Sequence, residues 1–330
     1  VTLASRVGRQ DRMSRFRPAA AAAMVSSLLA FCVSACDEPG SDTGTLTTLP
    51  TEPAVGEVEA GEDAPTLLKP WAPPMMHSRT VEVEGTNRNY VLSLPAGARQ
   101  REGLPVIFAF HGLGEEAVTM QRHTNLDAAD AIVVYMQGVE KAWSPAPYAK
   151  TTADQDLAYV DAVRAQLIGE FDVDQSRVFA AGFSNGGGFA AFLGCRRPQD
   201  FTAVATVAAA QYEKVFEGCS SIPMKQIDFH GTDDEVIQYN GGFRHGSSYD
   251  SIEESTDGAA ARNRCAAEPE ETKVLDTVVE ERWVDCDAGL EHYRIEGGHH
   301  VWPGGETDRS GIPKDFATHR LLEFFGIGLR

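Results

Sequence analysis

The stretch that most constrains the fold of this chain runs from Arg177 to Cys195 and reads RVFAAGFSNGGGFAAFLGC. Its apolar beginning, Val178 to Ala181, is typical of a buried parallel strand, and Phe189 to Leu193 favours a helix. Between them, Gly182 to Gly186 fits G-x-S-x-G, a sharp turn that can lift Ser184 to a helix N-terminus, where free N–H groups stabilise negative charge. A glycine-rich turn that merely contains a serine has the same pattern, so further motifs must decide.

Composition limits the classes of function. The chain has 330 residues, of which 42% are hydrophobic and 23% charged, as in ordinary soluble globular proteins. Its formal net charge of −19 repels phosphate backbones and anionic lipids, so we expect no nucleic-acid partner. None of the six cysteines forms a C-x-x-C pair, so no structural zinc site is expected.

An export signal is predicted near the N-terminus. Arg15 and Arg17 precede a nearly continuous apolar segment, residues 19–33, which is short for a membrane span but suits the core of a signal peptide. The small residues before Cys36 resemble a bacterial lipobox, in which this cysteine would be acylated and would anchor the protein to a membrane. The alternative is cleavage near Ala35 and free secretion. Either route predicts an extracellular or cell-envelope protein.

We predict three regions along the chain. Residues 1–36 form the signal peptide with its lipobox-like end. Residues 37–77 are rich in Pro, Gly, Thr, Glu and Asp, and cannot bury enough apolar area to offset their ordering entropy, so a disordered acidic tether is expected. Residues 78–330 alternate strand and helix patterns and form the folded domain.

The folded domain is predicted to be an α/β domain. An opening hairpin, several apolar runs and two helical segments alternate along it, which favours a mostly parallel sheet with helices on both faces. The expected strands are residues 80–83, 90–94, 104–110, 131–135, 178–181, 203–208, 224–229 and 292–295, and the clearest expected helices are residues 154–171 and 314–325.

Polar motifs follow the predicted strands at the ends where ligands of such folds bind. They are His111-Gly112-Leu113-Gly114, the serine turn, His230-Gly231-Thr232-Asp233-Asp234, and the segment 297–304. Together they place a serine, then an acid, then a histidine along the chain. That order is the one found in α/β-hydrolases.

A serine hydroxyl needs a base before it can act as a nucleophile, and the base needs an acid to orient it. Ser184 is the candidate nucleophile. His299 or His300 can supply the base, and Asp233 or Asp234 can supply the acid.

The backbone N–H groups of Asn185 and Leu113 are the expected donors to an oxyanion. Four other histidines are expected to have no catalytic role. His111 and His230 are expected to make structural hydrogen bonds across turns, and His123 and His292 to lie on the surface or a helix face.

Cysteines of an exported domain are expected to form disulfides. Cys195, Cys219, Cys265 and Cys286 permit three pairings. The shortest loops favour Cys195–Cys219 and Cys265–Cys286.

The four motifs together resemble the extracellular polyhydroxybutyrate depolymerase and feruloyl esterase group of α/β-hydrolases. The resemblance covers roughly residues 79–325, and G-G-x-H-x-W-P-G (297–304) is its most diagnostic part. It implies Ser184 as nucleophile, Asp234 as acid and His300 as base, with no metal or organic cofactor. Disulfides in comparable places, as expected above, are also common in that group.

The resemblance implies an exported serine carboxylesterase acting through an acyl-enzyme. Feruloyl or acetyl esters on plant polysaccharide such as xylan are the favoured substrates, and a short-chain polyhydroxybutyrate polyester is the alternative. A lipoprotein that only binds glycans is a third hypothesis. Trp143 and Trp302 are candidates for stacking on substrate, with a place in the apolar core as the alternative, and His299 is a candidate substrate contact.

The chain departs from the group's pattern at a few positions, which we expect near the substrate wall. Val301 replaces a common Thr, and Ala259 and Arg264 stand in the neighbourhood where a Trp is common.

Overall fold

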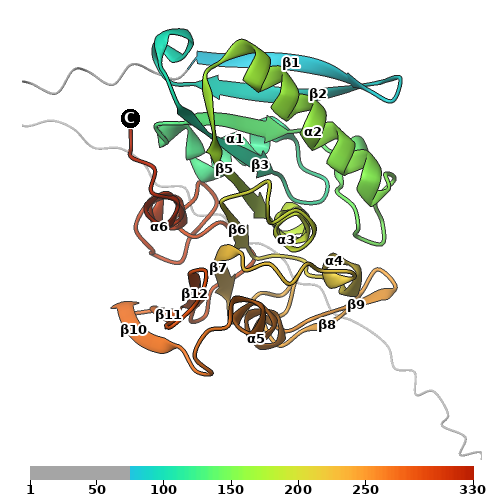
Figure 1. Cartoon of the computed structure of the whole chain (residues 1–330). Helices are drawn as coiled ribbons and strands as arrows, with labels where there is room; N and C mark the ends of the chain where they lie inside the picture. Colours follow the sequence, from blue (N-terminus) through green and yellow to red (C-terminus); the bar gives the residue numbers. More distant parts are fainter. Residues whose placement is uncertain (1–74) are drawn as a thin grey trace, which may run out of the picture. The chain divides into compact units, whose positions relative to one another are not determined.

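Ten strands form a single mixed sheet in the computed structural model, which describes residues 75–330 (Figure 1). The six central strands, β4, β3, β5, β6, β7 and β12, are parallel to one another, and the strand pairs towards both edges are antiparallel. In spatial order they are β1 (Met75–Val83), β2 (Thr86–Leu94), β4 (Ile132–Met136), β3 (Leu104–Phe110), β5 (Val173–Phe183), β6 (Ala203–Val207), β7 (Lys225–Gly231), β12 (Leu290–Ile295), β11 (Val278–Trp283) and β10 (Glu270–Leu275). A separate short hairpin joins β8 (Gly242–Arg244) to β9 (Ser247–Tyr249).

Helices cover both faces of the sheet because its central strands are apolar on both sides. On β3, Phe108 and Phe110 belong to the core shared with α2 and α3, whereas Ile107 and Ala109 belong to the core shared with α1 and α6. The helices are α1 (Ala117–Thr124), α2 (Ala153–Glu170), α3 (Asn185–Arg196), α4 (Glu213–Phe216), α5 (Ile252–Asn263) and α6 (Phe316–Phe325), with short 3-10 turns at Ala98–Gln100, Leu126–Ala128 and Val139–Lys141. The predicted α/β class with a mostly parallel sheet is confirmed.

Every predicted strand and both clear helices are present, but one edge of the sheet was not predicted. β10 is mostly exposed and rich in charge, so it carries no apolar run. β11 carries none either, because a buried glutamate, Glu280, lies two residues after buried Val278. α5 was also missed, although Ser251 and Glu254 form the capping box that begins it.

Both predicted disulfides are present. Cys195 at the end of α3 is joined to Cys219, and Cys265 just after α5 is joined to Cys286. Sequence separations of 24 and 21 residues correspond in the loop-entropy model to about 3 kcal/mol of stabilisation each.

The expected signal peptide, the acylation site at Cys36 and nearly all of the predicted tether lie outside the described residues. Within residues 75–330, none of the helices combines the length and the apolar composition that crossing a bilayer requires. The same residues contain no group of three His, Cys, Asp or Glu side chains arranged to hold a metal ion.

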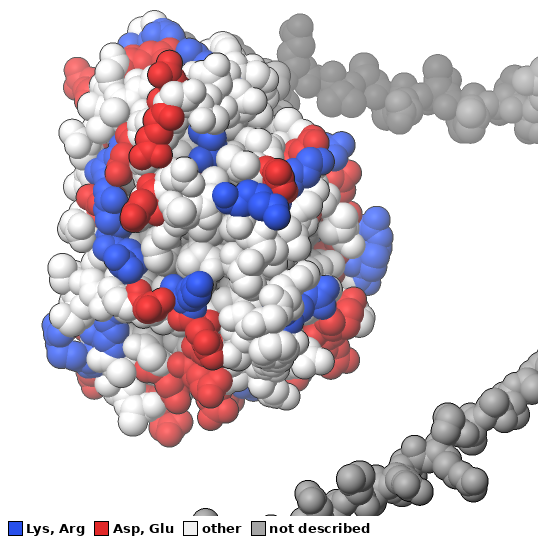
Figure 2. All heavy atoms as spheres, turned by 90° about the vertical axis from the view of Figure 1, so that its right-hand side faces the viewer, with Lys and Arg blue, Asp and Glu red and all other residues white. Residues whose placement is uncertain are grey.

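Figure 2 shows the face that lies to the right in Figure 1. On that face, Lys and Arg side chains are interspersed with Asp and Glu around uncharged areas, and they do not merge into one basic patch.

Candidate active site

Ser184 lies at the sharp turn between β5 and α3. Its backbone has φ 53° and ψ −116°, a left-handed conformation that is rare for a residue with a side chain. The turn is fixed by backbone hydrogen bonds, from Ser184 N–H to Val207 C=O at 2.8 Å and from Ala210 N–H to Ser184 C=O at 2.9 Å. The strained serine is therefore clamped against the segment that follows β6.

The glycines of the turn are required by close backbone contacts. A Cβ at Gly182 would lie 2.0 Å from the carbonyl oxygen of Gly186, and one at Gly186 would lie 2.1 Å from that of Phe110. A Cβ at Gly188 would lie 2.3 Å from the carbonyl oxygen of Ala210. These approaches let α3 begin directly beneath the ends of β3 and β6.

Ser184, His300 and Asp234 form one chain of hydrogen bonds. The Nε2 atom of His300 lies 2.9 Å from the Oγ of Ser184, and its Nδ1 lies 2.7 Å from Oδ2 of Asp234. A carboxylate can only accept, so the Nδ1–H of His300 donates to Asp234 and Nε2 accepts from the serine hydroxyl. This is the tautomer that a general base needs.

The acid and base loops meet at a pair of glycines. A Cβ at Gly231 would lie 2.1 Å from the carbonyl oxygen of Gly298, so the two loops touch through bare backbone. Gly297 N–H donates to the hydroxyl of Thr232 at 2.8 Å, and Asp233 N–H donates to Gly298 C=O at 3.0 Å. The glycines and the threonine of these two motifs therefore set the spacing between Asp234 and His300.

Asp234 is held ionised by its surroundings. Burial would raise the pKa of its carboxyl, but hydrogen bonds from His230 and His300 outweigh burial and hold the pKa well below its usual value. Oδ1 accepts the backbone N–H groups of Val236 and Ile237, each at 2.8 Å, which fixes the plane of the carboxylate.

His230 makes the structural hydrogen bond expected across its loop. Its Nε2–H donates to Ile237 C=O at 2.8 Å and lies 3.4 Å from Oδ2 of Asp234. Burial would lower the pKa of His230, but the hydrogen bond with Asp234 and the charge of Asp228 raise it above the usual value.

The expected oxyanion donors have no competing acceptor. The neighbouring N–H groups of Gly112, Gly114 and Glu115 all bond within the fold. Among the described residues, the N–H groups of Leu113 and Asn185 donate to no protein acceptor. Asn185 is also the first residue of α3, where free N–H groups are expected.

His111 locks the loop that carries Leu113. It is fully buried, and its Nδ1–H donates to Gly112 C=O at 2.8 Å, while Nε2 accepts from Gly138 N–H at 3.0 Å. Burial lowers the pKa of His111 to about 4, so the ring is neutral at pH 7. The structural hydrogen bond predicted for His111 is present.

The rings of Trp143 and Trp302, both candidates for stacking on substrate, are buried. Trp143 is 0% exposed; its indole N–H donates to His111 C=O, and both of its backbone groups bond to the amide of Asn185. Trp302 is 2% exposed and donates to Thr318 on α6. Both rings therefore belong to the core and are not exposed for stacking, and Trp143 supports the turn that carries Ser184.

A pocket of about 240 Å³ opens above Ser184. Aromatic rings form part of its lining, together with Arg244 at the end of β8 and His245 in the turn that follows. His245, which no strand-end motif pointed to, is in edge-to-face contact with Tyr148 at 4.7 Å between ring centroids. The lining residues are Gly112, Leu113, Glu115, Tyr148, Phe183, Ser184, Tyr212, Val236, Ile237, Arg244, His245 and His300.

The alternatives for acid and base lie outside this pocket. Asp233 is exposed, and His299, with a side chain that is 67% exposed, lies 3.3 Å from Glu235. The departures at Ala259 and Arg264 are not near the wall of this pocket. Ala259 lines a different cavity, and Arg264 forms an exposed ion pair with Asp287.

His292 is not a surface residue, contrary to expectation. It is fully buried on β12, directly beside Asp228 on β7, and its Nδ1–H donates to that carboxylate at 2.8 Å. Its Nε2 accepts from the hydroxyl of Tyr239 at 2.9 Å. Burial would raise the pKa of Asp228, but the hydrogen bond from His292 keeps it low.

Comparison with known proteins identifies a family for this chain. The model of an esterase family, described as "Putative esterase", matches residues 82–283, more than half of the chain. The chain is 30% identical over 310 residues to "Putative esterase NocK" of Nocardia uniformis, covering 83% of this chain and 90% of that protein. It is also 30% identical over 166 residues to feruloyl esterase C of Emericella nidulans, covering 47% of this chain and 58% of that protein.

Solved structures share the fold at low sequence identity. A ferulic acid esterase from Anaeromyces mucronatus aligns with a TM-score of 0.52 and 15% identity over 79% of this chain and 93% of that one. An acetyl xylan esterase from Aspergillus awamori gives a TM-score of 0.52 and 15% identity over 76% and 99%. The chain therefore belongs to this esterase family and has the α/β-hydrolase fold.

Proposed function

We propose that this esterase is a serine carboxylesterase, with Ser184 as nucleophile, His300 as general base and Asp234 as the acid that orients it. The observation that carries the proposal is the continuous path of hydrogen bonds, 2.9 Å from serine to imidazole and 2.7 Å from imidazole to carboxylate, opening into a pocket. The three side chains come from segments 116 and 66 residues apart, so local sequence alone does not bring them together.

The reaction follows from the direction of those hydrogen bonds. As the Ser184 oxygen attacks the ester carbonyl carbon, its proton passes to Nε2 of His300. The charged imidazole then gives that proton to the leaving alcohol as the ester bond breaks, which leaves an acyl group on the serine. A water molecule attacks the acyl carbon by the same route, and the acid is released with the serine restored.

The negative charge that develops on the carbonyl oxygen needs donors that are already in place. The N–H groups of Asn185 and Leu113 fit this role because no protein acceptor competes for them among the described residues. Asp234 stays ionised and stabilises the imidazolium ion that forms during each half of the reaction. Removing one such oxyanion donor costs about 100-fold to 1000-fold in rate.

Esters of an aromatic acid, such as feruloyl esters on plant polysaccharide, are the substrate class that we favour. Phe183, Tyr148 and Tyr212 are the aromatic residues that line the pocket. Flat aromatic groups pack well on such walls. Acetyl esters of xylan would use the same chemistry with a smaller acyl group.

The substrate proposal is tested by comparing ferulate release from arabinoxylan with hydroxybutyrate release from short-chain polyhydroxybutyrate. We expect ferulate release, and its loss in Ser184→Ala. Ser78→Ala, an exposed serine on β1, is the matched control and should keep full activity. Release of hydroxybutyrate alone would show that the substrate is a polyester and not an aromatic ester. Full turnover by Ser184→Ala would refute the assignment of Ser184 as nucleophile.

We also propose that the protein is exported, because both disulfides of the folded domain need an oxidising compartment to form and persist. Lipid anchoring at Cys36 is tested separately. Cys36→Ala should move the protein from the membrane fraction to the medium, and unchanged fractionation would favour simple secretion.

A further inference from the structure

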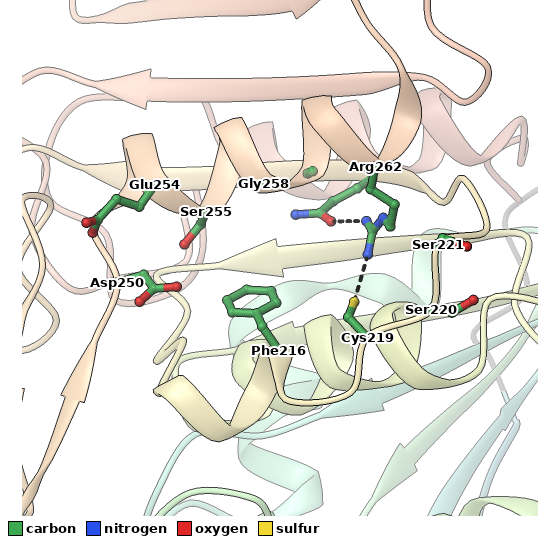
Figure 3. Close-up of a pocket in the computed structure, with 11 residues that line it drawn as sticks. Phe216, Cys219, Ser220, Ser221, Asp250, Glu254, Ser255, Gly258 and Arg262 are labelled. Atoms are coloured by element: carbon green, nitrogen blue, oxygen red, sulfur yellow. Dashed lines mark hydrogen bonds between the residues drawn. The ribbon is translucent and has the colours of Figure 1, made fainter.

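A second cavity, of about 300 Å³, lies between α5 and the segment that follows α4 (Figure 3). It shares no lining residue with the pocket above Ser184. Phe216 forms part of its floor, and Ser220, Ser221 and Ser255 are among the residues that line it. Its volume is at the lower end of the range of about 300 to 1,000 Å³ typical of small-molecule sites.

Arg262 is the charged group at one end of this cavity. Its side chain descends from α5 towards Cys219 in Figure 3, and its guanidinium donates to Oε1 of Gln226 at 3.2 Å and contacts the Cys219 sulfur at 3.6 Å. Its Nε is buried without a hydrogen-bond partner. Burial lowers the pKa of Arg262, and no carboxylate of the described residues offsets that effect.

An arginine in such a position normally has an anionic partner. Arg262 is partly buried, and a desolvated guanidinium group is stabilised by pairing; its planar shape fits a carboxylate through two parallel hydrogen bonds. Here both acceptors are neutral, so the strongest available partner is missing from the chain itself. The cavity beside the guanidinium leaves space for one.

The opposite end of the cavity is acidic. Asp250 and Glu254 lie there in Figure 3, with Phe216 between them and Arg262. Burial, together with the negative charges of Glu254 and Glu213, raises the pKa of Asp250, so this end repels a further anion. A ligand with one carboxylate at the arginine end and an uncharged body along Phe216 matches this polarity, whereas a dicarboxylate does not.

We propose that this cavity binds small organic monocarboxylates, with Arg262 holding the carboxylate group and Phe216 packing on the body of the ligand. The acids released by an esterase belong to this chemical class. The site is separate from the pocket above Ser184, so its occupancy can be measured without turnover.

Isothermal titration calorimetry of the purified protein with benzoate tests the proposal. We expect benzoate to bind, benzamide to bind at least tenfold more weakly, and terephthalate to bind more weakly than benzoate. Arg262→Gln should weaken benzoate at least tenfold, because a charge-assisted hydrogen bond is replaced by a neutral one, and Arg262→Lys should recover part of the affinity.

Two controls separate this site from the catalytic pocket and from misfolding. Arg244→Gln removes the cation near Ser184 and should leave benzoate affinity unchanged. Without ligand, the melting temperature of Arg262→Gln should equal or exceed that of the parent, because a partly desolvated charge without a carboxylate partner is removed.

Benzoate affinity that falls in Arg244→Gln and not in Arg262→Gln would assign the ligand to the catalytic pocket and overturn the proposal. So would equal affinity for benzoate and benzamide, or no binding of benzoate at millimolar concentration. None of these outcomes depends on catalysis. A failure of the proposed mechanism would show differently, as unchanged turnover in Ser184→Ala.

Discussion

Replacing Asp234 by Asn tests how the carboxylate directs the imidazole. In the parent, Oδ1 accepts two backbone N–H groups, from Val236 and Ile237, and Oδ2 accepts the Nδ1–H of His300. In the variant, the amide oxygen must stay with the two backbone donors. Turning it over would lose two hydrogen bonds, at about 1 kcal/mol each, and would oppose donors to donors.

The amide nitrogen of the variant therefore faces Nδ1 of His300 and donates to it. This fixes the proton of the ring on Nε2, which can then no longer accept the proton of Ser184. A base held in the wrong tautomer loses about 10⁴ in kcat, equivalent to about 5.4 kcal/mol of transition-state stabilisation. KM should change little because Asp234 does not line the pocket.

The assay is hydrolysis of p-nitrophenyl acetate with kcat and KM determined separately. Asp233→Asn is the matched control: the residue is the exposed neighbour in the same motif, and its variant should keep kcat within about twofold. If Asp234→Asn keeps more than a tenth of the parent kcat, or if Asp233→Asn shows the larger loss, the reasoning is refuted.

Further predictions concern the base, a buried histidine and the serine turn. His300→Ala should abolish turnover of p-nitrophenyl acetate and His299→Ala should only reduce it; the reverse ranking would show that the wrong histidine has been chosen. The pKa of His111 is lowered from 6.5 to about 4, so its contribution to stability is complete above pH 6.5 and is lost as the pH falls towards 4, by about 2 kcal/mol at pH 5. Urea unfolding should show a shallower pH dependence in His111→Asn, and identical slopes would contradict this. Gly182→Ala should destabilise by about 3 kcal/mol or more through its backbone clash. Gly169→Ala, on α2 with open space around its Cβ, should stabilise by about 0.5–1 kcal/mol, and equal melting temperatures of these two variants would refute the packing argument.

The parallel part of the fold could be predicted because its strands are buried on both faces. Leu104 to Phe110 coincides with β3 since every residue of that strand is buried and apolar. The charged outer strand β10 carries no such signal, because it borders solvent and only pairing with β11 makes it a strand. Local patterning therefore predicts central strands better than edge strands.

The candidate catalytic residues could be predicted because each lies in a short motif with its own glycines. The order of the residues left His299 and His300 open as the base and the motif resemblance favoured His300, whose Nε2 lies 2.9 Å from the Ser184 hydroxyl, whereas His299 is exposed beside Glu235. The walls of the pocket could not be predicted in the same way. Tyr148 and His245 come from loops without strand-end motifs and meet only through tertiary packing.

Buried polar pairs across neighbouring strands could not be predicted from the sequence either. His292 and Asp228 are 64 residues apart in the chain and become neighbours through the parallel register of β12 and β7. Likewise, the sequence leaves Trp143 open as either a ring that stacks on substrate or part of the core. Nothing in its local sequence shows that Asn185 binds its backbone beneath the serine turn.

The central claim is that Ser184 becomes covalently acylated, and trapping it with diethyl p-nitrophenyl phosphate tests this most directly. Peptide mass spectrometry of the inactivated protein should find one diethylphosphoryl group, on the peptide that contains Ser184, in proportion to the activity lost. Ser184→Ala should acquire none. Complete inactivation with the label on any other residue would contradict the account.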